Sequence, residues 1–385
     1  MRKLEQLSKE PKMDILKMVR KSCLRFQPYL SGRSVESLKR ECGLKSIIKL
    51  ASNENALGPS KKAIKSIKTN VEKVFTYPDS TSYELKKALS ERYQLPVGNI
   101  FTGAGGDEII ELIARLFFNP EDEIIVSKHS FIRYAMAVEL MGSKAIVVPM
   151  KDGFRYDLLA LAKACNENTK AVFVTNPNNP TGTYVTKAEI AEFFEKLPVN
   201  KFGAKPIVVL DEAYFEYAVL EKDYPNGLDF LKDNPNLIIF RTFSKIYGLA
   251  GLRVAYGFAN EEIVNYIERI RPPFNVNLLA QVAAVASITD NEQVKKSQKL
   301  IKKEKVYLYK EFEKLKIKYI KTAANFILFD SSPLKGIELF REFLKGGVIV
   351  RAMDEYELPY WVRVTVSIHE ENELFIKKLK KCVKV

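Results

Sequence analysis

A lysine at position 245 lies in a segment that could bind a phosphate and carry out covalent chemistry. The segment covers residues 241–253, RTFSKIYGLAGLR, and follows an apolar run that predicts a strand. An amine fixed at the end of a strand can form a Schiff base with a carbonyl group. Thr242, Ser244 and Arg253 would add two hydroxyls and a guanidinium, which suit a phosphate dianion. In a lysine-rich chain an isolated Ser-Lys pair is weak support, so this interpretation depends on the rest of the sequence.

Two upstream segments predict strands that end beside polar residues. Residues 170–182, KAVFVTNPNNPTG, indicate a buried strand that runs into a loop containing Asn179. Residues 205–214, KPIVVLDEAY, indicate a second strand that ends on Asp211, with Tyr214 three residues later. In an open parallel α/β sheet, ligands bind at the carboxyl ends of the strands. We therefore expect these three side chains and the lysine of the first segment to converge there.

This order of residues resembles the fold-type I aminotransferases that use pyridoxal 5'-phosphate (PLP), a class that includes aspartate and histidinol-phosphate aminotransferases. The shared pattern is Asn, then Asp-x-x-Tyr, then Ser-Lys, then Arg eight residues after the lysine. The resemblance implies that Lys245 holds PLP as a Schiff base and moves a proton between the substrate and the cofactor. Asp211 would pair with the pyridinium nitrogen, and Asn179 and Tyr214 would donate to the phenolate oxygen. Taken singly, Asp211 could instead cap a helix and Tyr214 could be a core aromatic.

Residues 99–118, NIFTGAGGDEIIELIARLFF, predict a seat for the cofactor phosphate. They indicate a short strand, a glycine-rich turn and an amphipathic helix, whose first N–H groups near Gly106 and Asp107 can hold an anion. The turn is neither a dinucleotide fingerprint nor a P-loop, because Glu108 stands where a third glycine would fall and no GK[ST] follows. Together with the hydroxyls and the guanidinium of the first segment, it matches the phosphate cup of the resembled family.

The resemblance also implies an aromatic ring stacked on the cofactor. Phe131, in the segment KHSFIRY, occupies the position that usually supplies this ring. Tyr134 is close enough in sequence to compete for the role. Core packing is the alternative for both side chains.

Three N-terminal segments resemble the signature of histidinol-phosphate aminotransferases, whose substrate carries its own phosphate. They are QPYLSGRS (27–34), LASNENALGPS (50–60) and TYPD (76–79). The resemblance implies that Tyr29 and Asn53 contribute to the substrate pocket. It also implies that Tyr77 reaches the cofactor phosphate of a partner subunit.

Two arginines near the C-terminus resemble substrate-binding residues of the same enzymes. Arg351 lies in GVIVRAM, and Arg363 follows twelve residues later in YWVRVTVSIHEEN. In the resembled enzymes the second arginine binds the amino acid carboxylate, and both help to hold the substrate phosphate, a task that suits the guanidinium fork. The alternative is an ordinary surface or strand-edge arginine, chiefly for Arg351.

The resemblance implies an α/β fold of the PLP-dependent transferase fold type I. We expect a mostly parallel central sheet with flanking helices, plus a smaller α+β domain. The predicted division is residues 1–57 as an N-terminal arm and part of the small domain, 58–285 as the large PLP-binding domain, and 286–385 as the C-terminal small domain. Residues 293–315 predict an amphipathic helix with a solvated charged face.

Composition bounds the class of protein without deciding it. The 385 residues are 46% hydrophobic, and 61 basic against 47 acidic residues give a net charge of +14. The lysines are scattered and no nucleic-acid-binding signature is present, so we expect no nucleic-acid partner. Two histidines and four widely spaced cysteines predict neither a metal site nor a disulfide framework. No segment has the apolar length of a signal peptide or a membrane span, so a cytoplasmic location without membrane association is expected.

The resemblance implies an aminotransferase that moves an amino group between L-histidinol phosphate and 2-oxoglutarate, giving imidazole acetol phosphate and L-glutamate. The partners that the resemblance implies are a small-molecule amino donor, a 2-oxo acid acceptor and a second copy of the chain, in a homodimer with shared active sites. Aromatic amino acid aminotransferase and threonine-phosphate decarboxylase are alternatives within the same fold. A catalytically silent PLP-binding module is the alternative outside the enzymes.

Overall fold

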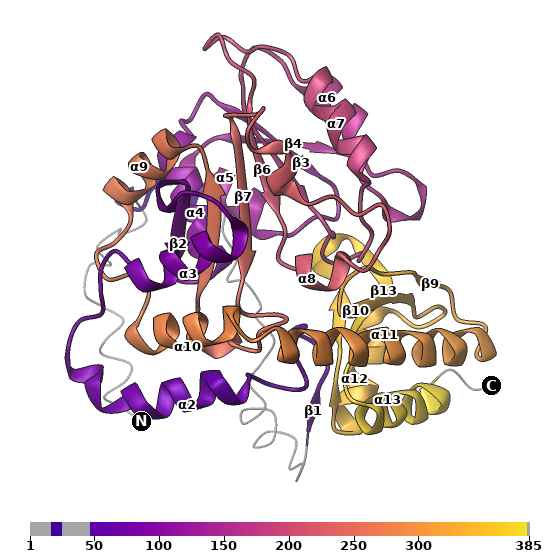
Figure 1. The fold of residues 1–385 in the computed structure, drawn as a ribbon. Coiled ribbons are helices and arrows are strands. Elements are labelled where there is room, and N and C mark those ends of the chain that lie inside the picture. Colours follow the sequence, from indigo (N-terminus) through magenta and orange to yellow (C-terminus); the bar gives the residue numbers. More distant parts are fainter. Residues whose placement is uncertain (1–16, 25–46, 383–385) are drawn as a thin grey trace, which may run out of the picture.

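Seven strands form the central sheet of the computed structural model, which describes residues 17–24 and 47–382 (Figure 1). They are β2 (Ile100–Gly103), β3 (Glu123–Ser127), β4 (Lys144–Val148), β5 (Thr169–Thr175), β6 (Ile207–Asp211), β7 (Leu237–Thr242) and β8 (Ala255–Ala259). Their order across the sheet is β2-β8-β7-β6-β5-β3-β4, and β8 runs in the direction opposite to the other six strands of this sheet. The predicted mostly parallel sheet is confirmed.

Both faces of this sheet are buried, which explains why its strands read as nearly continuous apolar runs. In β6, Val208 and Leu210 pack into one hydrophobic core, and Val209 between them packs into a second core. In β7, Ile239 belongs to the first core and Ile238 to the second. A slip of one residue would exchange the two sets of side chains, so the two cores fix the register of the strands.

Helices cover both faces of the sheet (Figure 1). Those of the sheet-bearing part are α2 (Lys61–Asn70), α3 (Tyr83–Tyr93), α4 (Gly106–Phe117), α5 (Arg133–Met141), α6 (Leu158–Ala164), α7 (Lys187–Lys196), α8 (Phe215–Ala218), α9 (Glu261–Ile270) and α10 (Leu278–Ile288). The first core receives apolar side chains from α6, α7 and α10, and the second from α4, α5 and α9. No helix in the described residues has both the length and the apolar character that a membrane crossing requires.

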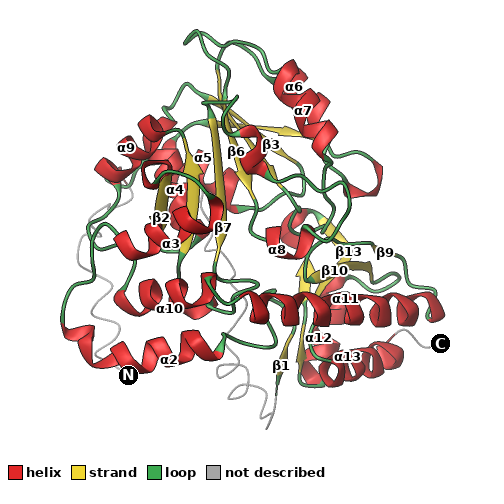
Figure 2. Cartoon of the chain, viewed as in Figure 1, coloured by secondary structure: helices red, strands yellow, loops and turns green. Residues whose placement is uncertain are grey.

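The C-terminal part of the chain builds a smaller lobe around a second sheet (Figure 2). Its strands are β9 (Tyr319–Ile320), β10 (Phe326–Asp330), β12 (Arg351–Met353) and β13 (Leu358–Thr365), and its helices are α11 (Asn291–Lys314), α12 (Gly336–Lys345) and α13 (His369–Cys382). The four strands are antiparallel, in the order β12-β13-β10-β9. The N-terminal strand β1 (Ile48–Lys49) joins this lobe by pairing in parallel with β11 (Val348–Ile349).

The predicted combination of a large α/β part and a smaller α+β part is thus confirmed. The helix predicted at residues 293–315 is also confirmed, as α11. The exact division of the chain at residues 57/58 and 285/286 stays a prediction.

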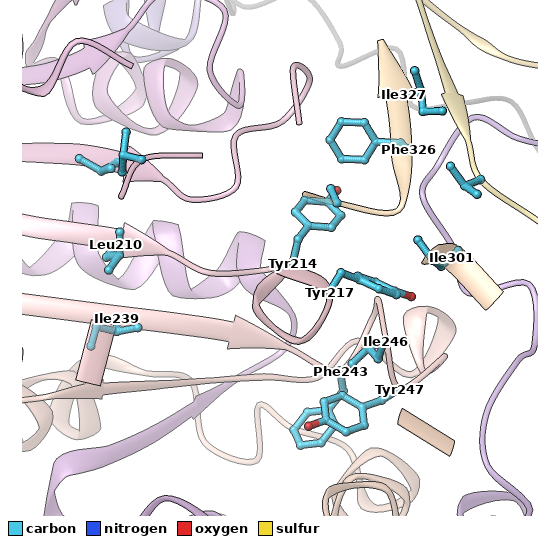
Figure 3. Close-up of a cluster of buried hydrophobic side chains, with 14 of the residues drawn as sticks. Leu210, Tyr214, Tyr217, Ile239, Phe243, Ile246, Tyr247, Ile301, Phe326 and Ile327 are labelled. Carbon is cyan, nitrogen blue, oxygen red and sulfur yellow. The ribbon is translucent and has the colours of Figure 1, made fainter. Parts of the chain in front are cut away.

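The two parts pack against each other beside the end of β6. Tyr214 follows this strand, and its ring centroid lies 5.2 Å from that of Phe326 in β10, at an interplanar angle of 75°. Figure 3 shows the contact within a cluster that also holds Tyr217 and Ile301, the latter on α11. Aromatic pairs in this edge-to-face geometry add stability beyond the area that they bury. The strand ends of the large part are therefore joined directly to the small lobe.

Candidate active site

A pocket of about 230 Å³ lies at the carboxyl ends of the central strands. The large part, the N-terminal segment and the small lobe all contribute to its walls. The predicted site residues that line it are Asn53, Gly106, Asp107, Phe131, Asn179, Asp211, Tyr214, Thr242, Ser244, Lys245, Arg253, Arg351 and Arg363. The structure therefore brings together side chains that the sequence separates by up to about 300 residues. Their roles stay predictions.

Lys245 lies in the turn directly after β7, where the strand ends at the pocket. Its Nζ atom donates a hydrogen bond to the carbonyl oxygen of Ser52 over 3.1 Å. Burial in the pocket lowers the pKa of Lys245 to about 8, and the positive charge of Arg363 acts in the same direction. A lysine with this pKa has an appreciable fraction of the neutral, nucleophilic amine near pH 7.

Asp211 ends β6 and is 4% exposed. It accepts hydrogen bonds from the Tyr134 hydroxyl at 2.5 Å and from the Ala213 N–H at 2.9 Å. Burial raises the pKa of Asp211 to about 6, although both hydrogen bonds act in the opposite direction. Among the described residues no ion pair involves this carboxyl group. A buried carboxylate that lines a pocket favours a cationic N–H group beside it, which fits the predicted pyridinium contact.

The two aromatic candidates occupy different places. Phe131 lines the pocket and is partly exposed. Tyr134 is fully buried, donates to Asp211 and stacks on Phe173 with the ring centroids 4.5 Å apart. The arrangement favours Phe131 for contact with a ring in the pocket and gives Tyr134 the role of supporting the carboxylate.

Tyr214 and two asparagines form a polar wall of the pocket. The Asn53 amide donates to the Tyr214 hydroxyl over 2.9 Å. Burial raises the pKa of Tyr214 to about 12, so the phenol remains protonated and can donate at neutral pH. The side-chain oxygen of Asn179 accepts a hydrogen bond from Arg363, which leaves its NH₂ group as the donating end. Donors of this kind suit the predicted phenolate contact.

The residues predicted to form the phosphate cup lie around the start of α4. Its N-cap residue, Gly105, makes no side-chain cap and has a φ of 83°. This positive φ favours glycine, and a Cβ atom there would lie 2.4 Å from Nη2 of Arg253, so another residue would force the guanidinium to move. Arg253 also lies 3.4 Å from Asp107 and 3.5 Å from the Ser244 hydroxyl. An uncapped helix start with a guanidinium and a hydroxyl beside it is a chemically suitable seat for the PLP phosphate.

The two predicted substrate arginines lie side by side on adjacent strands of the small-lobe sheet. Arg351 on β12 is the direct partner of Arg363 on β13. Nη2 of Arg363 donates to the carbonyl oxygen of Ala51 over 2.7 Å. Nη2 of Arg351 lies 2.6 Å from the Glu355 carboxylate. Both guanidiniums line the pocket and can reach an anionic ligand.

One predicted residue among those that the structure describes is not brought to this pocket. Tyr77 is 81% exposed and stacks on Phe274, with the ring centroids 4.6 Å apart. The prediction that it serves a partner subunit stays untested. Tyr29 lies outside the described residues. Within the described part of the chain, no group of three or more His, Cys, Asp or Glu is placed to hold a metal.

Sequence reasoning missed several residues around the site, among them Ser52, Glu355 and Tyr356. The Ser52 carbonyl holds Lys245, Tyr356 lines the pocket, and Glu355 pairs with Arg351. The last two lie between the predicted arginines, in the short connection between β12 and β13. Two strand-like runs separated by a few residues would have signalled a hairpin whose turn lies near these arginines. A backbone carbonyl such as that of Ser52 leaves no signal in side-chain types.

Comparisons with known proteins agree with one another. A family model described as aminotransferase class I and II matches residues 45–379. Histidinol-phosphate aminotransferase 2 of Carboxydothermus hydrogenoformans is 45% identical over 368 residues, which cover 96% of this chain and 100% of that protein. Histidinol-phosphate aminotransferase of Moorella thermoacetica is 44% identical, over 98% of this chain and 96% of that protein. The crystal structure of histidinol-phosphate aminotransferase from Sinorhizobium meliloti in complex with pyridoxal-5'-phosphate matches with a TM-score of 0.83 and 26% identity, covering 94% of this chain and 98% of that chain.

Proposed function

The chain belongs to the class I and II aminotransferases, and from this premise we propose that it transfers an amino group between L-histidinol phosphate and 2-oxoglutarate. The products are imidazole acetol phosphate and L-glutamate, a reaction of histidine biosynthesis. The observation that carries the choice of substrate is the facing pair Arg351 and Arg363, which line the same pocket as Lys245. Two guanidiniums in one pocket suit a donor that bears a phosphate.

The cofactor is PLP, and the pocket has the groups to hold it. Lys245 would bind its aldehyde carbon, Asp211 its ring nitrogen, and Asn179 and Tyr214 its phenolate oxygen. The start of α4, with Thr242, Ser244 and Arg253, would bind its phosphate. When bound, PLP supplies an electron sink that stabilises negative charge on the substrate α-carbon. The chemistry of the lining residues supports each of these assignments.

Lys245 is the proposed acid and base of the reaction. Its amine would accept the proton from the substrate α-carbon and return it to the neighbouring carbon of the cofactor. The pKa of about 8 suits this role, because proton transfer is most efficient when the pKa of the catalytic group lies near the working pH. Asp211 would keep the ring nitrogen protonated, and the Tyr134 hydrogen bond would stabilise the ionised carboxylate that this requires.

The arginines are proposed to bind the anionic groups of both substrates. Arg363 would bind the carboxylate of 2-oxoglutarate, and both arginines would hold the phosphate of histidinol phosphate. The Ala51 carbonyl and the Asn179 oxygen fix the orientation of the Arg363 guanidinium. A fork held in this way loses little conformational entropy when it binds a planar or tetrahedral anion.

A homodimer is the proposed active form. Exposed apolar side chains lie around the 3-10 helix at Val71–Phe75 and support a partner on this face. Phe75 is 86% exposed and Tyr77 is 81% exposed. In such a dimer, Tyr77 would reach the phosphate cup of the second copy. A cytoplasmic location is proposed as well, and the free Cys23, Cys165 and Cys382 support it because they form no disulfide framework.

The proposal is tested by steady-state glutamate formation from 2-oxoglutarate with the purified PLP-loaded protein. Donors to compare are L-histidinol phosphate, phenylalanine, tyrosine and threonine phosphate, with the cofactor absorbance recorded in parallel. We expect kcat/KM to be highest for histidinol phosphate. A preference for phenylalanine or tyrosine would replace the proposed substrate with an aromatic amino acid, while release of carbon dioxide from threonine phosphate without glutamate would indicate a decarboxylase.

A further inference from the structure

The segment of residues 354–357, here called the clasp, connects the two strands that carry the pocket arginines. It contains the 3-10 helix Asp354–Tyr356. Two contacts fasten it to the large part of the molecule. The ring nitrogen Nδ1 of His129 donates to the Tyr356 carbonyl oxygen over 2.6 Å, and Lys128 lies 3.0 Å from the Glu357 carboxylate. The first contact fixes the backbone directly after Glu355, and the second lies at an exposed side chain two residues beyond Glu355.

Glu355 is the member of the clasp that reaches a pocket arginine. Its Oε2 atom lies 2.6 Å from Nη2 of Arg351, and the two side chains are 24% and 15% exposed. Arg351 lines the main pocket, whereas Glu355 lines an adjoining hollow that shares Phe131 and Tyr356 with it. The ion pair therefore lies at the boundary between the pocket and the clasp.

The ion pair between Arg351 and Glu355 places a negative charge beside two neighbouring guanidiniums. Arg351 and Arg363 are direct cross-strand partners, and like charges in this arrangement repel. Arg363 donates hydrogen bonds to the carbonyl oxygen of Ala51 and to the side-chain oxygen of Asn179. Glu355 brings a full negative charge to this guanidinium pair. An anionic ligand that binds Arg351 would perform the same task.

We propose that Glu355 is an internal counter-anion, which holds Arg351 until the phosphate of the substrate displaces it, and which thereby sets the affinity for phosphate-bearing substrates. This inference rests on the proposed function, because it takes Arg351 as a contact of the substrate phosphate. A phosphate dianion offers more charge and more acceptor oxygens than one carboxylate, so it replaces Glu355. The exchange weakens the binding of phosphate-bearing substrate and product alike, which eases product release without changing the chemical step.

The variant Glu355→Gln tests the proposal, because the proposal predicts a fall rather than a rise in KM for histidinol phosphate. Glutamine keeps the size of the side chain but removes the competing charge. We expect KM for histidinol phosphate to fall about three- to tenfold, the range expected for losing a partly exposed ion pair, with kcat no higher than in the wild type. KM for phenylalanine should stay within about twofold, because this donor brings no phosphate to Arg351. Glu355→Ala should act in the same direction.

The matched control is Glu357→Gln, which makes the same change in the clasp at a carboxylate paired with Lys128. Its side chain is 75% exposed, so its ion pair with Lys128 contributes little to holding the clasp, and we expect KM to be unchanged. A rise in KM for histidinol phosphate in Glu355→Gln would overturn the proposal, because it would mean that Glu355 only positions Arg351 for binding.

A titration that needs no turnover separates this inference from the proposed function. Inorganic phosphate is titrated calorimetrically into the PLP-loaded protein, and we expect Glu355→Gln to bind it about three- to tenfold more tightly than the wild type. In the Arg351→Ala background, Glu355→Gln should not change the affinity for inorganic phosphate. Equal phosphate affinity of Glu355→Gln and the wild type would contradict the counter-anion role. Failure of the wild type to use histidinol phosphate would contradict the proposed function instead.

Discussion

The pocket has two walls of different construction. The sheet wall comes from the ends of the central strands and carries Asp211, Tyr214 and Lys245. Burial raises the pKa of Asp211 to about 6 and lowers that of Lys245 to about 8. The arginine wall comes from β12, β13 and the clasp. There Arg351 is held by an ion pair with Glu355 that is partly exposed to solvent.

This difference separates two tasks. Groups buried at the ends of strands keep shifted pKa values because solvent cannot reach and screen them. A partly exposed ion pair can exchange one anion for another at a small free-energy cost. We therefore expect changes in the sheet wall to alter turnover or folding, and changes in the arginine wall to alter KM.

Replacing the lysine of the sheet wall should have the largest effect. We expect Lys245→Ala to lower kcat by about four orders of magnitude or more, because the nucleophile and the proton carrier are lost together. The loss is measured as the turnover rate with one amino donor, with the cofactor absorbance recorded in parallel. Lys187→Ala is the control, since Lys187 pairs with Asp229 at the surface. Comparable turnover in Lys245→Ala would refute the proposed mechanism.

The next largest effect is expected directly beside Asp211. Glu212 follows it in sequence and forms an ion pair with Arg241 at 2.7 Å, and both side chains are fully buried. Glu212→Gln would leave the arginine charge without its partner, so we expect the free energy of unfolding to fall by about 3 to 5 kcal/mol. Urea denaturation measures this change.

The control for that prediction is Asp229→Asn, which breaks the surface pair with Lys187. We expect it to change the free energy of unfolding by less than about 1 kcal/mol. If Glu212→Gln and Asp229→Asn lowered the free energy of unfolding by the same small amount, the buried ion pair beside Asp211 would be no more important for stability than a surface pair.

Asp211 itself should make stability depend on pH. Its carboxyl group has a pKa of about 6 in the folded chain against an ordinary value of 3.8, so the folded state binds the proton more tightly. Stability of the cofactor-free protein should therefore decrease as the pH rises from about 4 to 6, by up to about 3 kcal/mol from this group. Asp211→Asn should remove this slope. Urea denaturation at several pH values measures it, and parallel curves for the two proteins would contradict the shifted pKa.

The sequence predicted the sheet wall better than the arginine wall for a physical reason. Apolar runs predict the strands that end near Asp211 and Lys245, and parallel strands bring their carboxyl ends to one edge of the sheet. The hairpin of β12 and β13 can be read from two strand-like runs, but no periodic pattern indicates that Glu355 in its connection contacts Arg351. The place of Tyr134 under Asp211 likewise depends on how α5 packs, which no local motif encodes.

The smallest effects are expected in the arginine wall, where the two arginines should differ. Each guanidinium would contribute a charge-assisted contact of about 1.5 to 3 kcal/mol, equivalent to roughly 10- to 150-fold in kcat/KM. We expect Arg363→Ala to lower kcat/KM for every amino donor and for 2-oxoglutarate. The reason is that this side chain also orders Asn179 and the segment around Ala51. Arg351→Ala should lower kcat/KM for histidinol phosphate more than kcat/KM for phenylalanine.

The ratio of the two donors in Arg351→Ala is the decisive quantity. Arg155→Ala is a suitable control, since Arg155 pairs with Glu189 away from the pocket. Equal losses for histidinol phosphate and phenylalanine would show that Arg351 has no phosphate role, and the arginine wall would then act through Arg363 alone. A selective loss for histidinol phosphate, with kcat for phenylalanine preserved, would locate substrate choice in the arginine wall and leave the sheet wall responsible for the chemistry.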